Sequence, residues 1–135
     1  MTHSRRHFLS TGAAAALATY AFASHSEEVI RVGVIGCGGR GTGAIWNCLS
    51  SSPMVRIVAL GDVFTERVQS AAAKLVNEPR SLVTPETTFS GFDAFQKVLS
   101  ADIDMVILAT PPHFRPEHFA AAVAADKHVF MEKPV

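Results

Sequence analysis

The sequence predicts an α/β fold built on a doubly wound parallel sheet, and three observations support this prediction. Short apolar runs alternate with segments of helical periodicity from residue 29 onward, as in repeated βαβ units. The first apolar run leads into a glycine-rich segment at residues 36–41. Polar or proline-containing segments follow the later apolar runs. In a parallel sheet, the carboxyl ends of the strands lie at one edge. We therefore expect the ligand site at the carboxyl ends of the strands.

The first βαβ unit is expected at the start of this pattern. Residues 29–35 are apolar on both faces, as expected of a central parallel strand. A helix is expected over residues 41–49, where apolar side chains form one stripe: Ala44, Ile45, Cys48 and Leu49. Pro53 interrupts the helical pattern. The next strand is then expected over residues 55–60.

The middle of the chain continues the alternation. The helix expected over residues 65–76 has apolar side chains at helical spacing, namely Phe64, Val68, Ala71, Ala72 and Leu75. Two prolines mark residues 77–85 as a loop. A short strand is expected over residues 87–89 and a further strand over residues 105–109. Between them, apolar residues mark a short helix: Phe92, Phe95, Val98 and Leu99.

A proline-rich segment separates the fourth expected strand from the last helix. Residues 110–116 cannot form a regular helix, because each proline biases the preceding residue away from the α region. Pro116 suits the first position of a helix that runs to about Asp126. Three of its side chains are expected to face inward: Phe119, Ala122 and Val123. The fifth strand is expected over residues 128–131.

The glycine-rich segment has the spacing Gly-x-Gly-x-x-Gly, formed by Gly36, Gly38 and Gly41. After a strand and before a helix, the first glycine makes the tight turn and the second lets a pyrophosphate approach the backbone. The third lets the helix pack on the sheet, and the N–H groups at its start then face the phosphates. The pattern predicts a Rossmann-type dinucleotide site. The intervening loop residues are expected to contact the cofactor as well: Cys37, Gly39 and Arg40.

Asp62 ends the next apolar run about twenty residues further on, where its carboxylate can accept both hydroxyls of the adenosine ribose. A 2′-phosphate would meet like charge there, so we expect NAD rather than NADP. Arg67, about one helical turn beyond, could reverse this preference. The alternative interpretation is that Asp62 only caps the following helix, a role for which Thr65 competes.

The N-terminus has the pattern of a secretory signal peptide. The pair Arg5-Arg6 precedes an alanine-rich apolar run over residues 11–23, which is too short to span a bilayer. Small residues in an Ala-x-Ala pattern, typical of a signal-peptide cleavage site, indicate cleavage before Ser24. The paired arginines resemble a twin-arginine leader, so residues 1–26 are excluded from the fold and we expect export to the periplasm. The alternative is a disordered or fortuitously amphipathic tail.

Composition and length limit the remaining possibilities. The formal net charge is zero with no basic patch, so nucleic acid is not an expected partner. The expected positions of Cys37 and Cys48 make a disulfide doubtful, and no Cys or His spacing suggests a metal site. Residues 27–135 would form one small domain, short for a complete dinucleotide fold. We therefore expect the N-terminal piece of a longer enzyme.

Four motifs in order resemble the Gfo/Idh/MocA family of NAD(P)-dependent enzymes, which includes glucose–fructose oxidoreductase and inositol dehydrogenase. The resemblance covers residues 29–135. The motifs are the Gly36 loop, Asp62, Ala109-Thr110-Pro111, and Lys127-His128-Val129-Phe130 leading into Glu132-Lys133-Pro134. The last of these is the signature of the family.

The resemblance implies a catalytic role for Lys133 beside the nicotinamide, where it orients substrate or cofactor. Its ammonium could hold a sugar hydroxyl whose proton must leave as hydride departs from the same carbon. Glu132 and Pro134 shape this turn, and Glu132 and Lys133 also contact the cofactor. Other positions take their roles from the same resemblance. Thr110 and Pro111 line the nicotinamide-side ribose, and His113 is a further candidate contact, whereas His118 and His128 are interpreted as structural.

The family usually places its acid–base residues in a second α+β domain, which is absent here and through which we expect a homo-oligomer to form. This chain offers no convincing proton-transfer pair of its own. We therefore expect it to bind nucleotide without turning over substrate.

Export limits how the cofactor can be used. Outside the cytoplasm no pool of nicotinamide cofactor is at hand, so a tightly bound cofactor must be regenerated in place. This predicts a sugar or polyol oxidoreductase that retains NAD, with NADP as the alternative cofactor, and that uses the twin-arginine machinery during export. Two other functions stay open. One is an NAD-dependent glycoside hydrolase or lyase with redox-neutral hydride recycling, and the other is a non-catalytic nucleotide- or sugar-binding protein.

Overall fold

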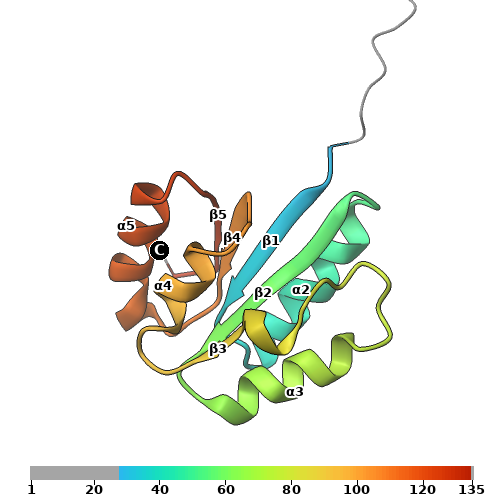
Figure 1. Ribbon diagram of the computed structural model, residues 1–135. Helices are drawn as coiled ribbons and strands as arrows, with labels where there is room; N and C mark the ends of the chain where they lie inside the picture. The colour runs from blue at the N-terminus through green and yellow to red at the C-terminus, as the bar shows by residue number, and fades with distance from the viewer. Residues whose placement is uncertain (1–27, 135) are drawn as a thin grey trace, which may run out of the picture.

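A five-stranded parallel sheet forms the centre of the molecule, as the computed structural model of the chain shows for residues 28–134 (Figure 1). Its strand order is β3-β2-β1-β4-β5. The strands are β1 (Ile30–Ile35), β2 (Val55–Asp62), β3 (Thr88–Ser90), β4 (Met105–Leu108) and β5 (His128–Met131). This confirms the predicted doubly wound parallel fold. The predicted signal peptide, residues 1–26, lies outside the described residues.

Helices cover both faces of the sheet (Figure 1). One face carries α2 (Gly39–Ser51) and α3 (Thr65–Leu75), and the other carries α4 (Ala94–Leu99) and α5 (Arg115–Ala124). Two short 3₁₀ turns precede β3 and α5: η1 (Pro85–Thr87) and η2 (Pro112–Phe114). None of the helices in residues 28–134 is long and apolar enough to cross a membrane.

Each face of the sheet has its own hydrophobic core. Under α2 and α3 the core includes Val34, Ile57 and Leu60, all fully buried. Under α4 and α5 it includes Ala59 and Val98. Burial of each valine, leucine or isoleucine side chain stabilises the fold by about 1.5–3 kcal/mol, so the two cores fix both helical layers on the sheet.

An irregularity in the pairing of β1 with β2 decides which side chains face which core. Val32 pairs with Ile57, but the next residue of β1, Gly33, pairs with Ala59. The extra residue, Val58, is a β-bulge that shifts the alternation of side chains along β2. Leu60 therefore faces the core under α3, and the small residue Ala59 faces α4.

Close packing of α4 on the sheet depends on two glycines. A Cβ at Gly33 would lie 2.7 Å from Val98 Cγ1 and 2.8 Å from Ile103 Cδ1. A Cβ at Gly61 would lie 2.8 Å from Val98 Cγ2 and 3.3 Å from the carbonyl oxygen of Ala94. These distances are shorter than carbon contacts in a packed core. The helix α4 can pack this close to the sheet only because both strand positions lack side chains.

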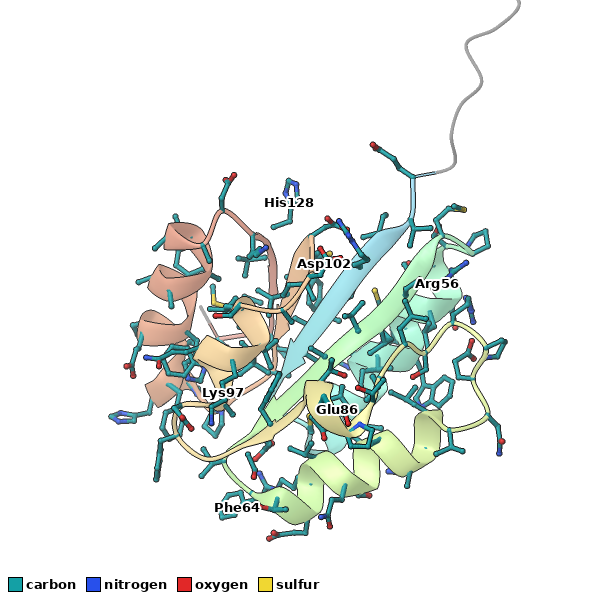
Figure 2. All side chains as sticks on the ribbon, in the orientation of Figure 1. Arg56, Phe64, Glu86, Lys97, Asp102 and His128 are labelled. Atoms are coloured by element: carbon teal, nitrogen blue, oxygen red, sulfur yellow. The ribbon has the colours of Figure 1, made fainter. Side chains whose placement is uncertain are left out.

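Ion pairs gather at the amino edge of the sheet. Arg31 at the start of β1 donates from Nη2 to Asp104 Oδ1 at 2.8 Å and from Nη1 to Asp102 Oδ2 at 2.6 Å. The hydrogen bonds from Arg31 lower the pKa of Asp104 to about 2. Asp102 lies at the end where β1 and β2 begin, and Phe64 lies at the opposite end (Figure 2). The two edges of the sheet are therefore chemically distinct.

One expectation about α5 was wrong. Phe119 and Val123 do not face inward, since 43% and 57% of their surfaces are exposed. The inward face carries Arg115, His118 and Ala122. These positions, like those expected, share one helical face. In its first turn Arg115 donates to carbonyl groups of the segments after β4 and β5, whereas Ala122 packs in the core under α4 and α5.

Element boundaries otherwise differ from the expected ones by a few residues. The helix over 41–49 begins at Gly39, and the last helix begins at Arg115 rather than Pro116. Residues 77–85 form a loop as expected, although Ser81 makes an isolated parallel bridge with Ile57. Phe64, expected to lie on the apolar stripe of α3, is the residue before the helix and is half exposed.

We expect Gly61→Ala to lower the free energy of unfolding by about 1–3 kcal/mol, because its methyl group would overlap Val98 under α4. Gly43→Ala is the matched control. A Cβ at Gly43, in the interior of α2, meets nothing within 4 Å, so alanine there should raise stability by about 0.5–1 kcal/mol. Urea denaturation of the chain measures both. Equal stability of Gly61→Ala and the wild type would contradict the close packing of α4.

Candidate dinucleotide-binding site

A single cleft of about 640 Å³ runs along the carboxyl edge of the sheet, where β1, β2, β4 and β5 end. The strand order places β1 between β2 and β4, which is the position where open α/β sheets bind ligands. The lining residues come from the glycine loop, the start of α3, the segment after β4 and the segment after β5. They are Gly36, Gly38, Gly39, Arg40, Gly41, Asp62, Val63, Phe64, Arg67, Phe92, Ala109, Thr110, Pro111, Phe114, Arg115, His118, Glu132 and Lys133.

Two of the three motif glycines are required by the packing of the chain itself. Gly36 has φ +96, and a Cβ there would lie 2.7 Å from the carbonyl carbon of Ala109 and the nitrogen of Thr110. A Cβ at Gly41 would lie 1.7 Å from the carbonyl oxygen of Gly36. The turn from β1 into α2 therefore accepts no side chain at either position.

Gly38 and Gly39 have no such packing reason to be glycine. Gly38 has φ −70, which any residue adopts, and a Cβ there would meet only Arg67 Nη1 at 3.9 Å. A Cβ at Gly39 would meet nothing within 4 Å. Both positions therefore leave bare backbone facing open cleft at the start of a helix, which suits the close approach of a pyrophosphate.

Asp62 is tied to the backbone on both sides. Its Oδ2 accepts from the Cys37 N–H at 2.7 Å, and its Oδ1 accepts from the Phe64 N–H at 3.0 Å. The side chain is only 7% exposed. No side chain caps α3, whose N-cap is Phe64, so Asp62 links the glycine loop to the start of α3 rather than capping the helix. Each of its oxygens keeps a second lone pair for a ligand hydroxyl.

Phe64 and Arg67 form the rim of the cleft beside Asp62. The Arg67 guanidinium lies 4.7 Å from the centre of the Phe64 ring, a cation–π arrangement that holds the cation in place. Both side chains line the cleft. An arginine thus lies at the same rim as the ribose-binding candidate Asp62.

The segment after β4 is fixed by a buried histidine. Thr110 Oγ1 lies 3.3 Å from His118 Nδ1, and the His118 ring stacks on Phe95 with ring centres 4.4 Å apart. Burial lowers the pKa of His118, so its imidazole is neutral at pH 7. This geometry agrees with the structural interpretation of His118. His128 is exposed at the start of β5.

An ion pair joins the glycine loop to the turn after β5. Arg40 Nη2 donates to Glu132 Oε1, and the Glu132 side chain is 12% exposed. The hydrogen bond from Arg40 lowers the pKa of Glu132, and the same bond raises that of Arg40. The pair is therefore charged at neutral pH. Lys133 follows directly and is exposed to the cleft.

Ten of the twelve residues expected to contact the cofactor line this one cleft. The other two are placed differently. Cys37 lies beneath the loop, where burial and the Asp62 carboxylate raise the pKa of its thiol to about 12. His113 is exposed and is not among the lining residues. Cys37 and Cys48, both within the described part of the chain, are free thiols.

Sequence reasoning did not find Arg115, Phe92 and Phe114 as lining residues. Arg115 stands in a polar helix start with Pro116, Glu117 and His118, so the sequence does not mark it as buried. Nothing in the local pattern marks Phe92 or Phe114. Within residues 28–134, no group of three or more His, Cys, Asp or Glu side chains could hold a metal ion.

Comparison with known proteins identifies the family of the chain that forms this cleft. The model of a family described as "Oxidoreductase family, NAD-binding Rossmann fold" matches residues 30–135. The chain belongs to the Gfo/Idh/MocA family. This confirms the family, the fold and the nicotinamide cofactor class that the sequence predicted.

The relatives and solved structures that this chain resembles include glycosyl hydrolases and dehydrogenases. It is 39% identical over 111 residues to a glycosyl hydrolase family 109 protein from Streptomyces niveus, covering 81% of this chain and 22% of the relative. It resembles scyllo-inositol dehydrogenase from Lactobacillus casei, solved with NAD(H) and scyllo-inositol (TM-score 0.64, 26% identity, 79% of this chain and 28% of that chain). It also resembles the WlbA dehydrogenase from Bordetella pertussis, solved with NADH and UDP-GlcNAcA (TM-score 0.65, 26% identity, 79% and 29%).

Substitution of the glycines should separate folding from binding. We expect Gly41→Ala to lower the free energy of unfolding by about 3 kcal/mol or more, because its methyl group overlaps the Gly36 carbonyl. Gly38→Ala should fold with wild-type stability but bind NAD about tenfold or more weakly, since its methyl group enters the cleft. Denaturation and NAD titration of the chain measure the two effects. Unchanged NAD affinity in Gly38→Ala would exclude this backbone from the binding site.

Proposed function

We propose that residues 27–135 are the NAD(P)-binding domain of a longer, exported oxidoreductase that acts on a sugar or polyol by hydride transfer. Residues 1–26 would be its signal peptide. The observation that carries the proposal is the meeting of bare glycine backbone, Asp62 and Lys133 in one cleft. The chain spans only 22–24% of the length of the curated relatives it matches. Two structural neighbours hold an inositol and a sugar nucleotide, which supports the substrate class.

Lys133 is the proposed catalytic residue. NAD, when bound, supplies the acceptor for a hydride. The ammonium of Lys133 would hold the substrate hydroxyl on the carbon that gives up its hydrogen. The hydrogen on that carbon would leave with its electron pair as hydride. The hydroxyl proton would pass to the general base, and a carbonyl would form. The positive charge then stabilises the negative charge that develops on the oxygen.

The remaining residues of the cleft would bind and orient rather than move protons. The bare backbone at Gly38 would approach the pyrophosphate, and the segment at Thr110 and Pro111 would line the nicotinamide-side ribose. His118 lines the cleft, but it is stacked on Phe95 and 6% exposed, which suits it poorly as a general base. We therefore place the general base in the remainder of the longer protein, which would also form the homo-oligomer.

NAD is the proposed cofactor. Asp62 can accept ribose hydroxyls through its free lone pairs, and a 2′-phosphate would face its carboxylate. Arg67 at the same rim is the residue that could accommodate that phosphate, which makes NADP the competing cofactor.

A second candidate function is redox-neutral cleavage of a glycoside. The curated relatives are named glycosyl hydrolase family 109 proteins, which favours this candidate. In such a reaction, the hydride removed from a sugar carbon returns to the product after the glycosidic bond has broken. Lys133 would hold the same hydroxyl in both reactions, so the two candidates share the cleft and differ in the fate of the hydride.

Export supports a retained cofactor. The arginine pair Arg5-Arg6 and the short apolar run after it have the pattern of a leader read by the twin-arginine machinery. A protein that crosses the membrane folded can carry its cofactor with it. Because no pool of nicotinamide cofactor is present outside the cytoplasm, the reaction must restore the oxidised form of the bound cofactor within each catalytic cycle.

The complete protein, purified from the exported fraction without added nucleotide and then denatured, should release about one dinucleotide per chain, as expected for a trapped cofactor. Chromatography and mass spectrometry identify it, and we expect NAD rather than NADP. Turnover of a glycoside without net NADH formation would favour the second candidate function. An empty protein that needs a continual supply of free NAD would contradict the retained cofactor. Full biological activity of Lys133→Ala would indicate a non-catalytic binding protein.

Replacement of both leader arginines by lysine, Arg5→Lys with Arg6→Lys, should remove the protein from the periplasmic fraction. The reason is that the twin-arginine signal is read by a receptor and is not an electrostatic anchor, so equal charge does not substitute for it. Fractionation and immunoblotting measure the distribution, with total cellular protein as the control. An unchanged periplasmic fraction would show that export does not use this route.

A further inference from the structure

Arg115 is a buried cation held entirely by backbone carbonyl groups. It is the first residue of α5 and is 7% exposed. Its Nη2 donates to the carbonyl oxygen of Thr110 at 3.0 Å, and its Nη1 donates to the carbonyl oxygens of Glu132 and Pro134. The guanidinium therefore joins the segment after β4 to the turn after β5.

Two of the three acceptors flank the proposed catalytic residue in sequence. Glu132 and Pro134 are the immediate neighbours of Lys133, and both of their carbonyls accept from the same nitrogen of Arg115. Guanidinium groups hold several acceptors in a fixed planar geometry, which a lysine cannot do. The backbone on each side of Lys133 is thus fixed to one rigid group.

The cost of this arrangement argues against a role in stability alone. A buried charge is expensive to desolvate, and Arg115 makes no hydrogen bond or ion pair with a carboxylate among residues 28–134. Its Nε is buried without a hydrogen-bond partner in the same part of the chain. An apolar side chain here would leave these three carbonyl oxygens without this donor, so we attribute the arginine to the carbonyls that it holds.

The same turn is held from its other side. The Glu132 carboxylate accepts from Arg40 of the glycine loop, whereas the Glu132 carbonyl accepts from Arg115. Arg115 itself lines the cleft. The position of Lys133 relative to the cleft is therefore set by two arginines from different elements.

We propose that Arg115 is a positioning residue that fixes the Glu132–Pro134 turn so that the Lys133 ammonium meets the substrate hydroxyl. The inference rests on the proposed function for the role of Lys133. It predicts that Arg115 contributes to turnover but not to binding of the pyrophosphate and adenosine part of the cofactor, which the glycine loop and Asp62 hold.

The test uses Arg115→Met and Arg115→Lys in the complete protein, with three measurements. Amide hydrogen exchange at Glu132 and Lys133 should rise about tenfold or more in Arg115→Met, because charged hydrogen bonds to the turn are lost. Affinity for ADP, which lacks both the nicotinamide and the ribose attached to it, should stay at the wild-type value. The kcat should fall about a hundredfold, as expected for a misplaced catalytic group, with little change in the KM for NAD.

Arg115→Lys restores the cation but not the planar geometry, so we expect kcat and exchange rates between those of Arg115→Met and the wild type. If Arg115→Met does not fold, Arg115→Lys alone decides the question. Arg80→Met is the matched control. Arg80 also donates to a carbonyl, that of Leu49 at 2.5 Å, but at the amino edge of the sheet. Its loss should lower stability and leave both kcat and the exchange of Lys133 unchanged.

Two results would overturn the inference. One is unchanged exchange at Glu132 and Lys133 in a folded Arg115→Met protein, and the other is unchanged kcat when exchange there has risen. Failure of the proposed function gives a different result, because Lys133→Ala would then keep the activity of the wild-type protein. In that case the exchange measurement still decides whether Arg115 holds the turn.

Discussion

The contact between the backbones of Gly36 and Gly41 is the constraint on which the rest of the site depends. A side chain at Gly41 would overlap the Gly36 carbonyl, and a side chain at Gly36 would overlap the peptide between Ala109 and Thr110. Three elements therefore meet where only bare backbone fits: the end of β1, the start of α2 and the end of β4. This junction brings the N–H groups of the α2 start next to the segment after β4. The cleft is lined by this junction, because Gly36, Gly41, Ala109 and Thr110 all face it.

Charge is distributed unevenly over a chain whose formal net charge is zero. At the amino edge, Arg31 is matched by Asp102 and Asp104. At the carboxyl edge the cleft is lined by four cationic side chains and two carboxylates, namely Arg40, Arg67, Arg115 and Lys133 with Asp62 and Glu132. Both carboxylates already accept hydrogen bonds from the protein itself. The cleft thus presents an excess of positive charge, and a low-dielectric groove focuses such a field on an anionic ligand.

The sequence allowed the fold and most of the cleft to be predicted because those features depend on local spacing. The Gly-x-Gly-x-x-Gly motif and Asp62 each reflect a requirement of the backbone that can be recognised from residue type and spacing in the sequence alone. The orientation of α5 does not. Phe119 and Val123 form as good a helical stripe as Arg115 and His118, and hydrophobicity favours the wrong pair. The deciding fact is that the first turn of α5 lies beside the carbonyl groups of the segments after β4 and β5, which accept from Arg115. These carbonyl groups come together only after the sheet has formed. The β-bulge in β2 was missed for the same reason, since pairing register is a property of two strands.

Asp62 has a consequence for any attempt to change the cofactor. The oxygens that would face a ribose are the same ones that accept the N–H groups of Cys37 and Phe64. A neutral or smaller residue chosen to admit a 2′-phosphate would also release the glycine loop from the start of α3. With Asp62 at the ribose as proposed, cofactor selectivity and loop rigidity are coupled through one carboxylate. On that basis, a change toward NADP in this scaffold needs a replacement acceptor for the loop in the same step, and we expect a single substitution at Asp62 to weaken binding before it changes the preference.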